Sequence, residues 1–251
     1  MDIIEVNRDN IGREHICCAL ADKKSDVGAA SKKAWMQSCF ADGYVFKKLN
    51  ARGKVLIEYV PAENAWSPIE ADGYLFIDCF WVSGQFKGQG YANALLNEAI
   101  AAAKQQGKLG LAALCTQKKM PFLSDPKYYK YKGFTVADTA QPYYELLYLP
   151  FAEHAPVPKF KACAKTGVIT EPGLVFYYTD HCPHNAKYIP QIVAAIKARG
   201  IPVTVHKIET KVQAQNAPNP FTTYAFYDQG KFVTNEIFGD KKLEKFLESI
   251  L

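Results

Sequence analysis

One short segment restricts the fold of this chain more than any other: Gln85-Phe86-Lys87-Gly88-Gln89-Gly90. It lies between a hydrophobic, strand-like run from Tyr74 to Val82 and a run from Ala92 to Gln106 whose apolar residues recur with helical spacing. Glycines at a strand-to-helix junction allow a ligand to approach the backbone closely. The free N–H groups and the dipole of the following helix favour an anion at the same place. The segment therefore predicts a phosphate or pyrophosphate site, with Lys87 adding charge at its rim.

Three phosphate-binding patterns can be compared with this segment. A Walker loop requires Lys-Ser/Thr after its last glycine, and Tyr91-Ala92 follows Gly90 here. The dinucleotide pattern Gly-x-Gly-x-x-Gly requires a third glycine where this chain has Asn93. The remaining pattern is Gln/Arg-x-x-Gly-x-Gly/Ala, which Gln85 to Gly90 matches at every defined position. An ordinary strand-to-helix turn needs neither the second glycine nor the Gln.

The length and composition of the chain favour two globular domains without a membrane segment. Its 251 residues are 49% hydrophobic, which is enough for two cores. No run of about 18 apolar residues is present, so we expect no transmembrane helix. The acidic start, Met1 to Val6, lacks the basic region of a signal peptide, which favours the cytoplasm. The net charge of +5 is not gathered in a basic block, so no nucleic-acid partner is predicted.

The seven cysteines are odd in number and irregularly spaced, and no Cys-x-x-Cys occurs. This pattern argues against a disulfide framework and against a zinc site. Cys79 and Cys115 fall in hydrophobic runs and are expected to be small core residues.

Hydrophobic periodicity predicts an ordered series of strands and helices in the first 150 residues. The predicted elements are a strand at 3–6, helices at 11–20 and 27–40, strands at 44–49, 54–60 and 74–82, a helix at 92–106, a strand at 109–114, a short helix within 121–131, and strands at 134–136 and 143–149.

A proline-rich stretch, residues 150–172, marks the natural boundary, after which a second α/β pattern begins. Its predicted elements are a strand at 174–179, a helix from His181-Cys182-Pro183-His184-Asn185 to Arg199, a strand at 202–208, a hairpin at 223–238 and a helix at 241–250.

The chain resembles the GCN5-related N-acetyltransferases (GNAT) whose members carry a YoaP-type C-terminal domain. The resemblance rests on the segments Ile77 to Gly90, Pro121 to Asp125 followed by Gly133-Phe134, Cys182 to Asn185, and Ala214 to Pro218. It implies an α/β (α+β) fold with a central mixed sheet in residues 1–150, a linker at 151–172, and a smaller thioredoxin-like α/β domain at 173–251.

The resemblance also implies direct transfer of an acetyl group from acetyl-CoA to the amine of a small molecule or peptide, without a metal. A homodimer is left open. The backbones of Phe80, Trp81 and Val82, on a strand that separates from its neighbour, would hold the pantetheine. The pyrophosphate would be held by the loop residues Gln85, Phe86, Lys87, Gly88, Gln89, Gly90, Tyr91 and Ala92.

The family places a tyrosine general acid four residues before a Gly-Phe pair, which gives Tyr129, with Tyr128 and Tyr131 as alternatives. A tyrosine hydroxyl, with a pKa of about 10, is suited to protonating a thiolate. Asp78 is the acidic residue on the central strand and the candidate general base. Glu70, Asp72, a water chain, or a purely structural role for Asp78 are the alternatives.

Cys182 lies beside Pro183 at a predicted helix start, where a thiol pKa is lowered, and is a candidate reactive thiol. Asn185 occupies the position of a resolving cysteine, and Thr222 the position at which thioredoxins have a cis-proline. Both departures argue against a dithiol oxidoreductase, and no metal site is expected at Cys182. The rival hypothesis is a CoA-binding or thiol-redox module in which Cys182 does the chemistry.

Overall fold

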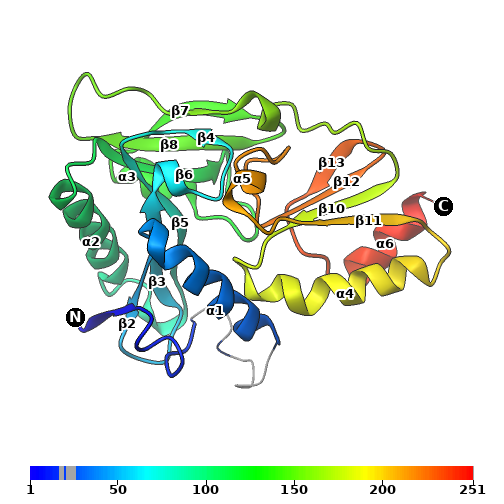
Figure 1. Ribbon diagram of the computed structural model, residues 1–251, viewed down its shortest axis with the longest axis horizontal. Helices are drawn as coiled ribbons and strands as arrows, with labels where there is room; N and C mark the ends of the chain where they lie inside the picture. The colour runs from blue at the N-terminus through cyan, green and yellow to red at the C-terminus, as the bar shows by residue number, and fades with distance from the viewer. Residues whose placement is uncertain (17–19, 21–26, 251) are drawn as a thin grey trace.

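The computed structural model describes residues 1–16, 20 and 27–250. Its larger sheet is mixed and seven-stranded, with the order β1-β2-β3-β5-β6-β8-β7 (Figure 1). Neighbouring strands are antiparallel except β5 and β6, which are parallel. The strands are β1 (Ile3–Val6), β2 (Val45–Leu49), β3 (Val55–Pro61), β5 (Tyr74–Val82), β6 (Gly110–Thr116), β7 (Thr135–Ala140) and β8 (Tyr144–Pro150).

Helices pack on both faces of this sheet. On one face, α2 (Tyr91–Gln105) and α3 (Pro126–Tyr131) contribute Leu95, Leu96 and Tyr129 to a core with β3, β5 and β6. On the other face, α1 (Val27–Cys39) contributes Trp35 and Met36 to a second core. The apolar stripe of α2 is the one expected from its helical periodicity. Short 3₁₀ helices lie at Phe40–Asp42, Ala62–Asn64, Gly84–Phe86 and Ala162–Ala164.

The C-terminal region has its own four-stranded sheet, with the order β11-β10-β12-β13. Its hydrophobic core includes the stacked rings of Phe176 and Phe226. The elements follow the predicted order of strand, helix, strand, hairpin and helix, and the likeness to thioredoxins stays a prediction. They are β10 (Leu174–Tyr178), α4 (Pro183–Lys197), β11 (Val203–Lys207), α5 (Lys211–Ala214), β12 (Tyr224–Asp228), β13 (Lys231–Thr234) and α6 (Asp240–Ile250).

The segment predicted as a linker is structured. It contains β9 (Lys159–Phe160), which pairs with β4 (Ile69–Glu70), and the Phe160 side chain is buried in the core on the α1 face of the large sheet. The segment thus contacts the N-terminal region at β9, and farther along it contacts the C-terminal region, where Val168 bridges to Lys231 and the Ile169 N–H donates to the Gly230 carbonyl. The domain limits at 150 and 173 stay a prediction.

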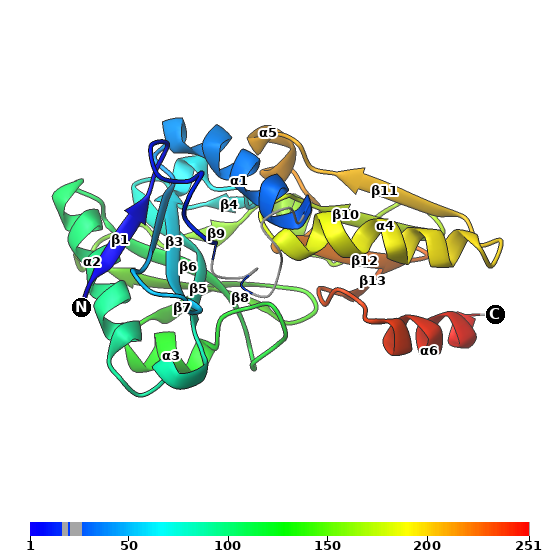
Figure 2. The ribbon, with the colours of Figure 1, turned by 90° about the horizontal axis from the view of Figure 1, so that it is seen from below.

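The N-terminal and C-terminal regions meet in a packed interface. Helix α1 lies beside α4 in both ribbon views (Figures 1 and 2). The Ser67 hydroxyl donates to the Pro220 carbonyl at 3.1 Å, and Phe221 is buried in the same core as α1. Because the junction buries apolar and hydrogen-bonded groups together, the two regions share one hydrophobic interior there.

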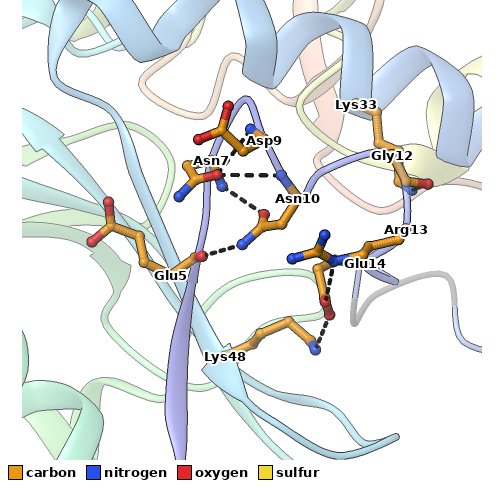
Figure 3. A network of polar contacts seen from close by, with 9 residues as sticks. All are labelled: Glu5, Asn7, Asp9, Asn10, Gly12, Arg13, Glu14, Lys33 and Lys48. Atoms are coloured by element: carbon orange, nitrogen blue, oxygen red, sulfur yellow. Dashed lines mark hydrogen bonds and ion pairs between the residues drawn. The ribbon is translucent and has the colours of Figure 1, made fainter.

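Residues 11–14 form turns and residues 15 and 16 have no regular structure, where the sequence predicts a helix over residues 11–20 (Figure 3). The Asn10 carboxamide oxygen accepts from the Asn7 N–H at 2.9 Å, and the Asn7 carboxamide oxygen accepts from the Asn10 N–H at 3.3 Å. These reciprocal bonds have the pattern of a helix capping box, but Gly12 in the following turn disfavours a helix, and the backbone continues as turns. The helix prediction is therefore wrong for residues 11–16, and its residues 17–19 lie outside the described part of the chain.

Candidate active site

Strand β5 separates from β6 halfway along its length, and Asp78 lies where the separation begins. The two strands pair only from Tyr74 to Ile77 on β5. On the other side of β5, Tyr59 of β3 pairs with Ile77 and Glu58 pairs with Cys79, so Asp78 is an extra, bulged residue. A bulge bends its strand and redirects its side chain. The bulge and the separation together open the sheet at Asp78.

A cavity of about 630 Å³ lies on the side of β5 where the glycine loop and α3 meet. Its lining combines the end of β5, the loop, the first turn of α2, and α3. The residues are Phe80, Trp81, Val82, Phe86, Lys87, Gly88, Gly90, Tyr91, Ala92, Asn93, Lys119, Leu123, Ser124, Asp125, Tyr128, Tyr129 and Tyr131.

The structure places nine of the eleven predicted cofactor-binding residues on the wall of this cavity. Gly88 and Gly90 have φ angles of 76° and 82°, a region that L side chains rarely adopt. The other two predicted residues, Gln85 and Gln89, are not lining residues. Instead, the Gln89 side-chain amide donates to the Gln85 carbonyl at 2.5 Å, which closes the loop on itself.

Tyr129 is 1% exposed and reaches the cavity from α3. Its ring contacts Phe80 of β5 and Phe134, with ring centroids 6.0 and 5.0 Å apart. Burial raises the pKa of the Tyr129 hydroxyl well above its usual value, so the hydroxyl remains protonated at neutral pH. A protonated hydroxyl in a cavity wall is a proton donor.

The two alternative tyrosines are placed differently. Tyr131 is 81% exposed, at the rim of the cavity. The Tyr128 hydroxyl donates to the Asn93 side chain of α2 at 3.0 Å. Of the three, Tyr129 is therefore the one whose hydroxyl is shielded from solvent.

A second cavity, of about 260 Å³, lies between the N-terminal and C-terminal regions. A narrow cavity of about 30 Å³ shares lining residues with both larger ones, so the three follow each other along the separated part of β5. The second cavity is lined by Lys32, Lys54, Asp78, Cys79, Trp81, Phe122, His181, Cys182, His184, Phe221 and Thr223.

Behind this cavity lies a buried ionic network centred on Glu58 of β3. Lys32 of α1 and His181 of the C-terminal region contact its two carboxylate oxygens at 2.5 and 2.7 Å, and the Tyr44 hydroxyl donates to it at 2.5 Å. Glu58 and Lys32 are both almost fully buried. Asp78, with a side chain 14% exposed, has an oxygen 3.7 Å from His181 Nε2. Charges from three elements of the N-terminal region therefore converge on one histidine of the C-terminal region.

The network sets the protonation of its members. Burial alone would raise the pKa of Glu58, but Lys32 and His181 outweigh burial and hold it at about 2. Burial would lower the pKa of His181, and the carboxylates of Asp78 and Glu58 raise it instead. Burial raises the pKa of Asp78, and nearby Glu58 acts in the same direction. A raised pKa suits Asp78 to accepting a proton.

The other acidic candidates for the general base, Glu70 and Asp72, lie away from the cavities. Glu70 forms an ion pair with Lys159 at 2.9 Å on β4 and β9, and Asp72 is exposed in the turn before β5. Neither lines the described cavities. Of the three carboxylate candidates for the general base, Asp78 is thus the one that lies at the opening of the sheet.

Cys182 precedes the first residue of α4 and lines the second cavity, as the half-buried Cys79 does. Cys115 is buried as expected, but Cys79 is not a plain core residue, because the bulge next to it turns β5 toward the cavity. Asn185 is buried and donates to the carbonyls of Thr179 and Thr223. The position of a resolving cysteine is therefore occupied by a side chain that holds the backbone.

Sequence reasoning did not identify Glu58, Lys32 or the contact of His181 with them. A signal for Glu58 was present: it is a charged residue inside the hydrophobic run of β3, and charged residues are rarely buried without a partner. Within the described ranges no group of three or more His, Cys, Asp or Glu side chains is placed to hold a metal ion. No described helix is both long and apolar enough to cross a membrane.

Two family models match the chain: the acetyltransferase (GNAT) family over residues 16–122 and the YoaP-like family over residues 202–245. A relative from Bacillus subtilis (strain 168), described as the uncharacterized N-acetyltransferase YoaP, is 38% identical over 250 residues and covers 100% of both chains. Among solved structures, Escherichia coli YhbS with CoA is 12% identical, with a TM-score of 0.41 over 63% of this chain and 88% of its own. Salmonella typhimurium yncA with acetyl-CoA is 17% identical, with a TM-score of 0.42 over 64% and 98%.

Proposed function

This chain belongs to the YoaP-type GNAT N-acetyltransferases, and we propose that it transfers an acetyl group directly from acetyl-CoA to the amine of a small molecule or peptide. The observation that carries the proposal is the meeting of three features at one cavity. The separated end of β5, the left-handed glycines Gly88 and Gly90, and the shielded hydroxyl of Tyr129 all line it.

The residues of the large cavity suit CoA. Amide groups at the start of α2 and in the loop favour the pyrophosphate, and Lys87 adds a positive charge. The β5 residues Phe80 to Val82, which have no β6 partner in the described sheet, offer backbone groups to the pantetheine. Tyr129 lines this cavity and Asp78 lines the narrow cavity beside it, and the thioester would react between them.

Asp78 and Tyr129 account for the protons that move in the proposed transfer. The acceptor ammonium gives one proton to Asp78, and the free amine attacks the acetyl carbonyl carbon to form the C–N bond. The C–S bond breaks, its electron pair stays on sulfur, and Tyr129 protonates the sulfur. The nitrogen then loses a second proton, which restores the Tyr129 hydroxyl, and Asp78 releases its proton to water.

The loop is tested by a bulky substitution at Gly88, matched with one at Gly107. Both glycines have left-handed φ angles, 76° and 63°, and at neither would an added Cβ meet an atom within 4 Å. Both variants therefore carry backbone strain, but only Gly88 lines the cavity. We expect Gly88→Val to weaken CoA binding tenfold or more, about 1.4 kcal/mol, in calorimetry. Gly107→Val should bind CoA like the unsubstituted chain.

Turnover is tested by thiol release from acetyl-CoA in the presence of a panel of amines. We expect amine-dependent release from the unsubstituted chain and a large loss in Gly88→Val at low acetyl-CoA concentration. Equal CoA affinity in folded Gly88→Val and Gly107→Val would refute the loop assignment.

A further inference from the structure

The cavity between the two regions has features of a substrate site that the large cavity does not explain. It reaches β5 at Asp78, on the far side of the strand separation from the glycine loop, and the narrow cavity shares lining residues with both. Its wall comes from both regions, since His181, Phe221 and Thr223 lie beyond residue 173. Neither region alone forms this cavity.

The wall of this cavity is largely aromatic. Trp81 and Phe122 are 39% and 41% exposed, and both face it together with Phe221. Phe122 also has a φ angle of 64°, which is unusual for a bulky residue and tends to occur at functional sites. Large rings left partly open to solvent in a concave site suit an apolar or aromatic ligand body.

The charge pattern of the cavity suits a cation at one end. Among the described lining residues Asp78 is the carboxylate, and Glu58 lies behind it, already paired with Lys32 and His181. An ammonium at Asp78 would meet a negative charge in a cavity whose aromatic residues also attract cations. Four basic side chains also line the cavity, Lys32, Lys54, His181 and His184, and Lys32 and His181 are paired with Glu58. The ammonium end is therefore confined to the part of the wall near Asp78.

We propose that this cavity is the acceptor site of the acetyl transfer, that it takes a primary ammonium group on an aromatic or apolar body, and that the C-terminal region completes it with His181 as a positioning residue for Asp78. The inference rests on the proposed function. His181 is held by Thr223, whose hydroxyl lies 3.1 Å from His181 Nδ1, and by Glu58 at 2.7 Å. Its Nε2 atom lies 3.7 Å from an Asp78 carboxylate oxygen. These contacts hold the charge of His181 beside the proton acceptor.

The ligand class is tested by calorimetry on the full chain saturated with CoA, using 2-phenylethylamine as the probe. We expect binding in roughly the millimolar range or tighter, at least tenfold tighter than ethylamine, because the phenyl group is removed from water. The alcohol 2-phenylethanol should bind more weakly than the amine, and Asp78→Asn should abolish that preference. Equal binding of the amine and the alcohol, or no binding of the amine, would overturn the proposal.

The aromatic wall is tested with Phe122→Ala, matched with Val205→Ala. Val205 is exposed to a similar extent, at 38%, but lies on β11 outside the cavity. We expect Phe122→Ala to weaken 2-phenylethylamine binding fivefold or more and to leave CoA binding unchanged, whereas Val205→Ala should change neither. Unchanged amine binding in Phe122→Ala would refute the proposed acceptor site. The proposed function would still stand if CoA binding and thiol release are as expected.

The role of His181 is tested by the pH dependence of amine binding. A positive His181 lowers the pKa of Asp78, so His181→Gln should move the acid limb of the binding profile to higher pH. If that variant does not fold, Thr223→Val removes the hydroxyl at His181 Nδ1, and Thr223→Ser retains it as the control. We expect the shift in Thr223→Val and not in Thr223→Ser. An acid limb that does not move in either His181→Gln or Thr223→Val would refute the positioning role.

Discussion

The cavity at the glycine loop and the cavity between the two regions share β5 as a wall, but the chain builds them in different ways. Much of the wall of the first comes from one stretch, Phe80 to Asn93, with a second contribution from residues 119–131. The second needs side chains from α1, from Lys54 before β3, from β5, from the loop at Phe122 and from two stretches of the C-terminal region, residues 181–184 and 221–223. The first is thus a local structure, whereas the second exists only after the two regions have packed together.

The two cavities also differ in how they hold charge. At the loop, Lys87 and the residues up to Gly90 are exposed, as an anionic ligand requires. At the interface, Glu58, Lys32 and His181 are buried and satisfy one another. Buried charges are costly unless they are paired. Loss of any one of these three side chains should therefore weaken the packing of the two regions. The predictions below separate these two modes, from the largest expected effect to the smallest.

The largest effect is expected at the loop cavity, in Tyr129→Phe. Removing the proposed proton donor should lower kcat about 10²–10⁴-fold, because in the proposed transfer the hydroxyl acts only as the thiolate leaves. Acetyl-CoA affinity should hardly change. Steady-state kinetics and calorimetry measure the two quantities, and Tyr131→Phe, at an 81% exposed side chain, is the control. Normal turnover in Tyr129→Phe would move the acid to another group.

The next effect concerns the interface, in Glu58→Gln. This variant leaves Lys32 and His181 buried without their carboxylate, which should lower the free energy of unfolding by about 3–5 kcal/mol. Chemical denaturation measures it. In the control Glu98→Gln, a half-exposed pair with Lys47 is lost, and the expected cost is below about 1 kcal/mol. Similar losses in both variants would mean that the buried network does not stabilise the packed interface.

The smallest effect is the pH dependence of stability. The pKa of His181 is raised above 6.5 in the folded chain, so its contribution is complete below pH 6.5 and is lost as the pH rises through the folded pKa. The pKa of Glu58 is lowered from 4.5 to about 2, so its contribution is present above pH 4.5 and is lost as the pH falls toward 2. We expect the free energy of unfolding of the unsubstituted chain to decline above pH 6.5 and the decline to be smaller in His181→Gln. Each unit of pKa shift corresponds to about 1.4 kcal/mol.

The sequence was most informative where the pattern was local. The limits predicted for the central strand, Tyr74 to Val82, are those of β5, and the predicted loop and helix follow it. Membership of the GNAT and YoaP families was also correctly predicted. The helix expected at 11–20 is wrong over residues 11–16, where Gly12 disfavours a helix and the backbone forms turns. Hydrophobic periodicity alone does not weigh that glycine.

Hydrophobic period and the spacing of glycines determined the central strand and the glycine turn that leads into α2, because each depends on residues close together in the chain. The phosphate-binding role of that turn and the choice of Tyr129, which the family resemblance implies, stay predictions. Only the tertiary structure decided what surrounds Asp78. Its bulge depends on the register between β3 and β5. The contact between His181 and Glu58 joins residues 123 positions apart. Such long-range contacts depend on how the two regions pack and exclude water from the charges between them. No local sequence pattern predicts them.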